Sequence, residues 1–332
     1  MRVLFFSFIC ISSICFLSCK KSTQVPDPNV YVHPDTLTSG WTKQSGVIAS
    51  PSSVQGGDIF FINQNVGYTG TGSSTIYKTT DGGNTWHTLS NGFGISNIGA
   101  TPNDRVFFMR DNFDSIIRSV DGGLNFSKHY AMGGLVSDIF FSNNLTGICT
   151  TQQNAILSTN GGDSWSVIGP LPYISSLTNK GSVISMNNNS AWIGYDKYVY
   201  HSNDNFATWK LDSIPDVIAN LGICSIFAPS SSVVYASSFT GYVFKSTDGG
   251  NTFSFIKKLD SYYFANLFSD LHFVSANEGF MSLGRSIFKT IDGGNSWSLV
   301  VTLGSTDIIE IHFTDAQHGW AICGDGSILK YN

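Results

Sequence analysis

The sequence predicts an all-β fold, a seven-bladed β-propeller of four-stranded blades whose last blade is closed by the N-terminal strand. Three observations predict it. A motif built around Asp-Gly-Gly returns at intervals of 39 to 44 residues, a second motif occurs in four of the repeating units, and the two chain ends carry complementary parts of one blade. A repeat of this length that supplies its own strands indicates radially stacked sheets.

The first motif, here called the Asp-Gly-Gly turn, lies between two short strand-like runs and predicts a hairpin. Its first copy, residues 79–86, reads Thr-Thr-Asp-Gly-Gly-Asn-Thr-Trp. An Asp side chain accepts bonds from nearby backbone N–H groups, glycine allows positive φ, and the aromatic residue anchors the hairpin in apolar surroundings. We therefore expect a structural role for Asp81 and Trp86, Asp121 and Phe126, Asn160 and Trp165, Asp204 and Trp209, Asp248 and Phe253, and Asp292 and Trp297.

The fourth copy departs from the motif, because Asn205-Phe206 stands where the others have Gly-Gly. Two residues with side chains in place of two glycines predict a distorted turn.

The second motif supplies two further strands ahead of the hairpin. In four units a Phe precedes a Gly by six residues, with polar residues between: Phe61 and Gly67, Phe141 and Gly147, Phe273 and Gly279, and Phe313 and Gly319. Each unit therefore contains four strands.

The chain ends give the number of blades. The last unit stops at Asn332, where its Asp-Gly-Gly turn would begin. The missing outer strand is found at the other end, where Gly40-Trp41-Thr42-Lys43 resembles the strand that follows each turn. Pairing the two ends closes the ring and leaves no blade incomplete. The prediction is one propeller over residues 40–332, with six internal blades and one shared blade.

The N-terminus predicts export and a lipid anchor. Residues 3–17 are strongly apolar behind Arg2, too short for a comfortable membrane span and typical of a signal peptide. Ser18-Cys19 directly after this run resembles the lipobox of bacterial lipoproteins, which implies a signal peptide over 1–18 and acylation of Cys19. The alternative is ordinary secretion. Residues 19–39 contain three prolines and read as a lipidated tether. The expected location is a bacterial membrane surface, at the outer membrane and periplasm or at the cell surface.

Charge and cysteine usage exclude several classes of function. With 18 Lys+Arg against 23 Asp+Glu, the chain has no basic footprint for nucleic acid. Cys149, Cys224 and Cys323 fall in blades that are not neighbours, so we expect three free, buried thiols. The histidines are scattered singly, and no spacing indicates a metal or cofactor site.

The hairpin is similar to the Asp-box, or bacterial neuraminidase repeat, of sialidases, sortilin-type receptors and xyloglucanases. The unit also resembles the photosystem II assembly and stability factor family, on residues 288–297 and 319–330. This resemblance covers residues 40–332 and implies a propeller. The repeat serves many activities, so the resemblance is specific for fold and not for function. In related families the Asp-box lies opposite the ligand site, which implies a structural role for its aspartates.

The residues argue against sialidase activity. By resemblance a sialidase needs three arginines from different blades, but Arg105, Arg110 and Arg118 all fall in blade two and only Arg285 lies elsewhere in the mature domain. Loop carboxylates on the opposite face, which include Asp111, Asp114 and Asp196, leave a glycosidase-like pair open. We expect no catalytic residue, cofactor or metal.

The predicted binding face lies opposite the Asp-Gly-Gly turns, where the sequence stops repeating. Tyr262 and Tyr263, between blades five and six, suit contacts with protein or sugar. On the same face we place Asp111, Asp114, Tyr195, Asp196 and Arg285. The first hypothesis is a non-catalytic, membrane-anchored scaffold that binds a protein partner. The alternative is a propeller that binds or cleaves a glycan.

Overall fold

The computed structural model describes ten stretches of the chain, and everything below refers to them. They are residues 34–48, 57–71, 75–91, 95–109, 115–130, 135–151, 154–170, 183–215, 222–260 and 269–332. The expected signal peptide, Cys19 and most of the expected tether lie outside these residues, as do Asp111, Asp114, Tyr262 and Tyr263.

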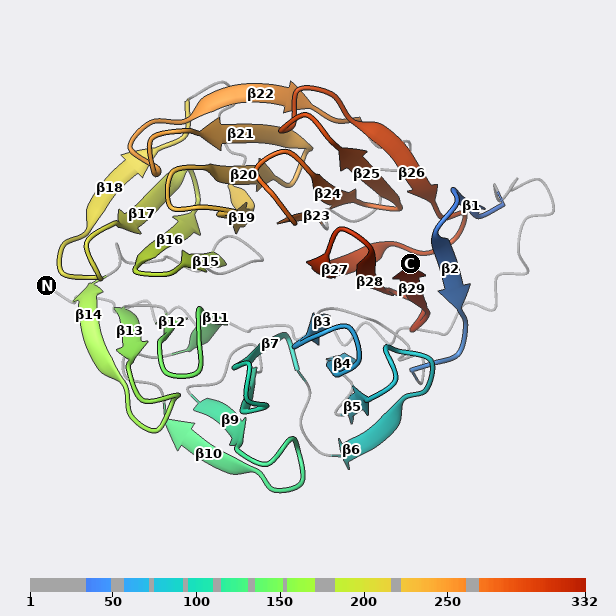
Figure 1. The fold of residues 1–332 in the computed structure, drawn as a ribbon, viewed down its shortest axis with the longest axis horizontal. Coiled ribbons are helices and arrows are strands. Elements are labelled where there is room, and N and C mark those ends of the chain that lie inside the picture. Colours follow the sequence, from blue (N-terminus) through green and yellow to red (C-terminus); the bar gives the residue numbers. More distant parts are fainter. Residues whose placement is uncertain are drawn as a thin grey trace, which may run out of the picture. The chain divides into compact units, whose positions relative to one another are not determined.

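Seven antiparallel sheets follow one another around a ring, which is a seven-bladed β-propeller (Figure 1). The blades form in chain order because each consists of short runs that can pair locally through tight turns. Blade 1 is β3 (Gly57–Phe61), β4 (Gly67–Thr71), β5 (Thr75–Thr79) and β6 (His87–Asn91). Blade 2 is β7 (Asn97–Ala100), β8 (Val106–Met109), β9 (Ser115–Ser119) and β10 (Ser127–Tyr130). Blade 3 is β11 (Val136–Phe141), β12 (Gly147–Thr151), β13 (Asn154–Ser158) and β14 (Ser166–Pro170).

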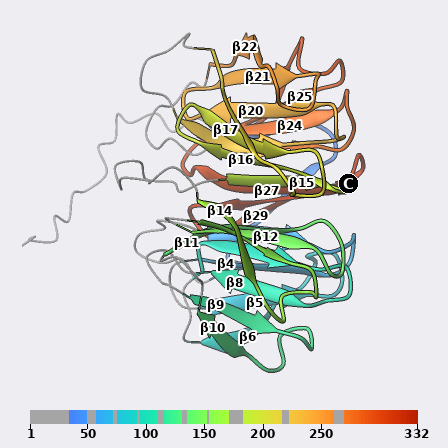
Figure 2. The same cartoon turned by 90° about the vertical axis from the view of Figure 1, so that its left-hand side faces the viewer.

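The remaining blades repeat this order, with the first strand of each innermost. Blade 4 is β15 (Val183–Asn187), β16 (Ser190–Tyr195), β17 (Tyr198–Ser202) and β18 (Lys210–Ser213). Blade 5 is β19 (Ile223–Phe227), β20 (Val234–Ser238), β21 (Tyr242–Ser246) and β22 (Ser254–Lys258). Blade 6 is β23 (Ser269–Phe273), β24 (Gly279–Leu283), β25 (Ser286–Thr290) and β26 (Ser298–Thr302). Blade 7 is β27 (Ile308–Asp315), β28 (His318–Cys323), β29 (Ile328–Tyr331) and β2 (Trp41–Gln44). Figure 2 shows the strands running across the thickness of the ring.

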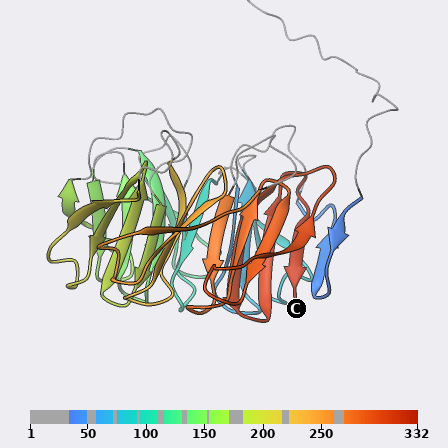
Figure 3. The ribbon, with the colours of Figure 1, turned by 90° about the horizontal axis from the view of Figure 1, so that it is seen from above.

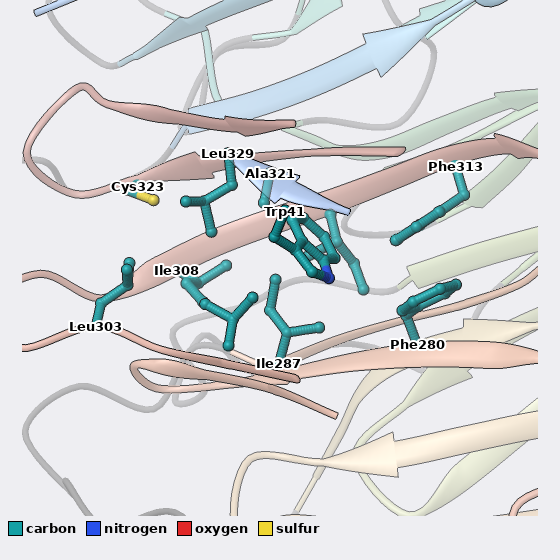
Figure 4. Packing of buried hydrophobic residues seen from close by; sticks show 11 residues of the cluster. Trp41, Phe280, Ile287, Leu303, Ile308, Phe313, Ala321, Cys323 and Leu329 are labelled. Carbon is teal, nitrogen blue, oxygen red and sulfur yellow. The ribbon is translucent and has the colours of Figure 1, made fainter. Parts of the chain in front are cut away.

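The N-terminal strand completes the last blade, as predicted. Strand β2 pairs antiparallel with β29, with Trp41 opposite Tyr331 and Gln44 opposite Ile328. The Trp41 side chain is buried between blades 6 and 7, against Phe280 and Phe313 (Figure 4). Burying one large aromatic between two blades stabilises the junction that closes the ring.

A further strand precedes β2 and was not predicted. Strand β1 (Thr36–Leu37) pairs with β26 and adds a fifth strand to blade 6. It falls inside the segment 19–39 expected to be a tether, so the boundary at residue 40 leaves this strand out. Figure 3 shows β1 and β2, in blue, beside the red strands of the last blades.

The core is divided into clusters between neighbouring blades. One cluster joins Ile59, Phe61 and Tyr77 of blade 1 to Trp320 and Ile328 of blade 7, and corresponding clusters lie at the other junctions. Cys149, Cys224 and Cys323 are buried and form no disulfide, which confirms the prediction for them. No helix in the described part of the chain is long and apolar enough to cross a membrane.

Candidate functional site

The Asp-Gly-Gly turn satisfies its own carboxylate. In blade 1 Asp81 Oδ1 accepts bonds from the Thr79 hydroxyl (2.8 Å) and the Thr85 N–H (2.9 Å), and Oδ2 accepts one from the Thr85 hydroxyl (2.6 Å). The Gly83 N–H donates to Thr79 Oγ1. Bonds from Thr85 lower the pKa of Asp81 to about 2, because they favour the charged form. The carboxylate therefore folds the turn and is held ionised by it.

The other copies use the same contacts with small changes. Asp248 and Asp292 bond Thr252 and Ser296 as Asp81 bonds Thr85. Asp121 accepts two bonds from Asn125. In blade 3 Asn160 Oδ1 accepts the Ser164 N–H and its Nδ2 donates to the Ser164 hydroxyl, so an amide replaces the carboxylate without losing a partner.

In the degraded copy of blade 4 the two central residues keep the left-handed backbone course of the intact turns, so the distortion expected there is not seen in their φ values. Asn205 and Phe206 adopt φ values of 62° and 65°, in the left-handed region that Gly82 and Gly83 use elsewhere. Asp204 still accepts both bonds from Thr208. A left-handed phenylalanine is strained, so surrounding packing must hold it.

That packing comes from blade 3. In six blades the second strand carries a buried aromatic residue directly opposite a Lys, Arg or His on the third strand: Tyr68 and Lys78, Phe107 and Arg118, Trp192 and His201, Tyr235 and Lys245, Phe280 and Lys289, and Trp320 and Lys330. All of these pairs except the one in blade 6 face the Gly-Gly of the next blade. Blade 3 instead has Ile148 opposite Leu157. Phe206 is buried in the same cluster as Ile148, with Leu157 packed against it. The aromatic ring missing from blade 3 is thus supplied by the turn of blade 4.

The glycine carbonyls of the turns bind the preceding blade. Trp320 Nε1 donates to Gly82 O (3.0 Å), Lys78 Nζ to Gly122 O (2.9 Å), and Trp192 Nε1 to Gly249 O (2.8 Å). A Cβ on Gly250 would lie 2.7 Å from Trp192 Nε1, so the second glycine leaves room for the indole. The turns therefore hold neighbouring blades together as well as closing their own hairpins. The Lys or Arg ahead of the motif signals this role in the sequence, but sequence reasoning missed it.

The arginines of the described residues are engaged in structural contacts. Arg105 and Arg118 of blade 2 both bind Asp163 of blade 3, at 3.1 and 2.7 Å. Arg285 donates to Gly304 O (2.9 Å) and to Asp307 (3.4 Å). These three do not converge on one point, while Arg110 lies outside the described residues.

Two described turns on the opposite face carry residues predicted for the binding face. Tyr195 ends β16 and Asp196 follows it in the turn to β17, where the Asp196 carbonyl oxygen accepts the Ile223 N–H across the blade junction (2.6 Å). Burial, followed by the nearby Asp196 carboxylate, raises the pKa of Tyr195. Arg285 lies between β24 and β25 on the same face. The structure therefore places Tyr195 and Asp196 of blade 4 and Arg285 of blade 6 at the strand ends opposite the Asp-Gly-Gly turns.

A ring of buried polar groups joins the innermost strands, and sequence reasoning did not assign it. Asp58 accepts the N–H of Ile98, Asp138 that of Ile184, and Asp270 that of Ile311, at 2.6, 2.7 and 3.2 Å. Each bond links one inner strand to that of the next blade. Burial raises the pKa of Asp58 and of Asp138 to about 7.

Two histidines complete this ring. His312 bonds the Phe61 carbonyl oxygen (3.0 Å), and its ring lies 5.1 Å from that of His272. Burial lowers the pKa of His312 to about 4 and that of His272 well below its usual value, so both are neutral near pH 7. No His, Cys, Asp and Glu cluster within the described stretches could hold a metal ion.

The chain matches no protein-family model and no curated protein. Solved structures similar to it include YCF48 from Cyanidioschyzon merolae, at 18% identity and TM-score 0.68, covering 89% of this chain and 99% of that one. A structure of YCF48 bound to D1 peptide has 14% identity and TM-score 0.66, covering 89% and 97%. The WD40 propeller domain of Doa1 has 11% identity and TM-score 0.67, covering 91% and 97%. At these identities the likeness shows the fold: the chain is a seven-bladed β-propeller similar to YCF48 and to WD40 propellers.

Proposed function

We propose that the propeller is a non-catalytic scaffold that binds a protein partner through the face opposite the Asp-Gly-Gly turns. One observation carries the proposal: on the repeating face, the carboxylates of the turns are used within the turn, and the glycine carbonyls bind the preceding blade. These groups have little left to offer a ligand. Specific recognition is then expected where blades differ, in the connections on the other face.

The solved neighbours support a protein partner. YCF48 has been captured with D1 peptide, and the WD40 propeller of Doa1 has the same architecture. A fold by itself does not set function, so the argument rests on the face and its residues. Tyr262 and Tyr263 are the proposed aromatic contacts, and Tyr195 and Asp196 are proposed for the same face.

The proposed binding face can be tested by comparing it with its opposite. Purified full-length protein is incubated with a detergent extract of membranes from its own cells, and recovered proteins are quantified. Alanine at both Tyr262 and Tyr263 should lower recovery of a specific partner about tenfold, about 1.4 kcal/mol. The matched control replaces Leu124 and Ile291 with Ser, because these side chains are 79% and 72% exposed on the repeating face.

Equal recovery by both variants, or loss with the control alone, would reject the proposed face. A glycan array with reducing-sugar release, run on the same proteins, tests the alternative directly. Glycan binding that is lost in the tyrosine variant would show that the ligand of this face is a sugar and not a protein.

We also propose that Cys19 is acylated and anchors the protein to a bacterial membrane. The support is the position of Ser18-Cys19 directly after an apolar run. Several acyl chains give stable anchoring where a single one is marginal. Fatty-acid labelling of the wild type, absent in Cys19→Ser, tests this; label that persists in Cys19→Ser would reject it.

A further inference from the structure

Strand β26 is unusual among the seven outer strands of the blades. An outer strand presents unpaired N–H and C=O groups that can pair with another chain, and charged residues or proline normally discourage this. Strands β2, β10, β18 and β22 carry lysine, and β14 ends in Pro170. Strand β6 is polar, His-Thr-Leu-Ser-Asn. Strand β26 reads Ser-Leu-Val-Val-Thr, with three consecutive aliphatic residues and no charge or proline.

This strand is also the one whose outer edge is covered in the described part of the chain. The other outer strands end their sheets, whereas β26 is followed by β1. Thr36 pairs with Thr302 and Leu37 with Val301. The Thr38 N–H and hydroxyl both donate to the Val300 carbonyl oxygen at 3.0 Å. The outer strand that lacks a charge or a proline is thus also the one whose edge is covered by another strand.

The segment that covers β26 is short, and Asp35 just before it adds two contacts. Asp35 Oδ1 accepts the Gly304 N–H (2.9 Å) and Oδ2 accepts Lys43 Nζ (2.8 Å). Both side chains are partly exposed, and an ion pair of this kind adds little to stability. Ring closure rests on a different element, since Trp41 and β2 belong to blade 7. Leu37 packs against the cluster that contains Trp41, and Asp35 binds Lys43 of β2. The strand pairing is separate, because β1 pairs with β26 and β2 with β29, so β1 can leave β26 while β2 stays paired in blade 7.

We infer that β1 covers an edge through which this protein can self-associate. When β1 leaves β26, two copies of this chain pair edge to edge through their β26 strands. A second copy is the fitting occupant because β26 is uncharged, and antiparallel pairing of a strand with its own copy satisfies two-fold symmetry. Leu299, 43% exposed, then adds apolar contact.

The test uses the full chain with β1 released. Leu37→Asp with Thr38→Pro removes the apolar contact and the N–H that Val300 accepts. The matched control, Leu37→Ile with Thr38→Ser, keeps both. Sedimentation velocity should show a dimer dissociation constant lower by about tenfold or more in the released variant, and wild-type behaviour in the control. Adding Leu299→Lys to the released variant should reverse the dimer, because lysine disfavours edge pairing.

A second experiment applies if the released variant does not fold. Cysteines at the paired positions Thr36 and Thr302 pin β1 when oxidised and leave it free when reduced. The reduced form should dimerise more strongly than the oxidised form. Equal association of the two forms, or a dimer that persists after Leu299→Lys, would overturn the inference. Partner recovery through Tyr262 and Tyr263 is a separate readout, so the two proposals can fail independently.

Discussion

The indole N–H of Trp320 donates to the carbonyl oxygen of Gly82 across 3.0 Å, joining the last blade to the first. The same indole stacks on Phe61, with ring centroids 3.5 Å apart. Because both groups are buried, this contact ties ring closure to the Asp-Gly-Gly turn of blade 1. Trp320→Phe should keep the stacking but leave Gly82 O without this donor, and lower the free energy of unfolding by about 1–3 kcal/mol.

Urea unfolding measures this loss, and Trp297→Phe is its control. Trp297 Nε1 donates to Gly294 O within its own, more exposed turn, so the same substitution should cost less there. Equal losses in the two variants would contradict an inter-blade role for the Trp320 bond.

The Asp-Gly-Gly turn predicts a difference between two substitutions of Asp81. Asp81→Ala removes the acceptor of the Thr85 N–H and hydroxyl and should cost about 1 kcal/mol of unfolding free energy. Asp81→Asn should cost less, because Asn160 makes the equivalent contacts in blade 3. Thermal and urea unfolding of both variants check this order. A larger loss for the Asn variant would contradict it.

Phe206 and Ile148 predict a rescue. Phe206→Gly restores the second glycine of the motif and relieves a left-handed side chain, but empties a buried site, so we expect a net loss of about 2–3 kcal/mol. Ile148→Phe returns an aromatic residue to the position that other blades use. The double variant should be more stable than the sum of the single changes by about 1 kcal/mol. Additive losses in a double-mutant cycle would show that Phe206 does not replace an aromatic residue missing at Ile148.

The inner-strand aspartates predict a pH effect of definite sign. Burial raises the pKa of Asp58 in the folded protein to about 7, against its ordinary value of 3.8, so the unfolded chain releases this proton first as pH rises. Its contribution to stability therefore falls as pH rises from about 4 to about 7. Asp58→Asn keeps an acceptor for the Ile98 N–H and cannot ionise. The variant should gain stability relative to wild type as pH rises through this range.

The neutral His312 changes stability with pH in the direction opposite to Asp58. The folded pKa of His312 is about 4 against 6.5, so its contribution is lost as pH falls from about 6.5 to about 4. His312→Gln should therefore lose stability relative to wild type near pH 7 and recover the difference on acidification. Urea unfolding at several pH values separates the two slopes. Parallel profiles for wild type and either variant would contradict the assignment for that residue.

The sequence predicted much of the fold because the evidence for it is local. An aspartate, two left-handed residues and a hydroxyl make a turn within a few positions, and an alternating pattern makes the strands on each side. The pairing of Trp41 with the last blade was also predictable, because a missing outer strand leaves an edge that must be filled. The candidate binding face was predicted by exclusion. Its main contacts, Tyr262 and Tyr263, lie outside the described residues and stay predictions.

By itself, the sequence determined the number of blades, their strand order and the closing strand, since each follows from a repeat period and its ends. Only the tertiary structure decided what joins one blade to the next. The bond from Trp320 to Gly82, the place of Phe206 beside Ile148 and the strand β1 on β26 all connect residues from different repeats. Such contacts depend on the spacing and shape of neighbouring sheets, which a single-strand pattern does not record.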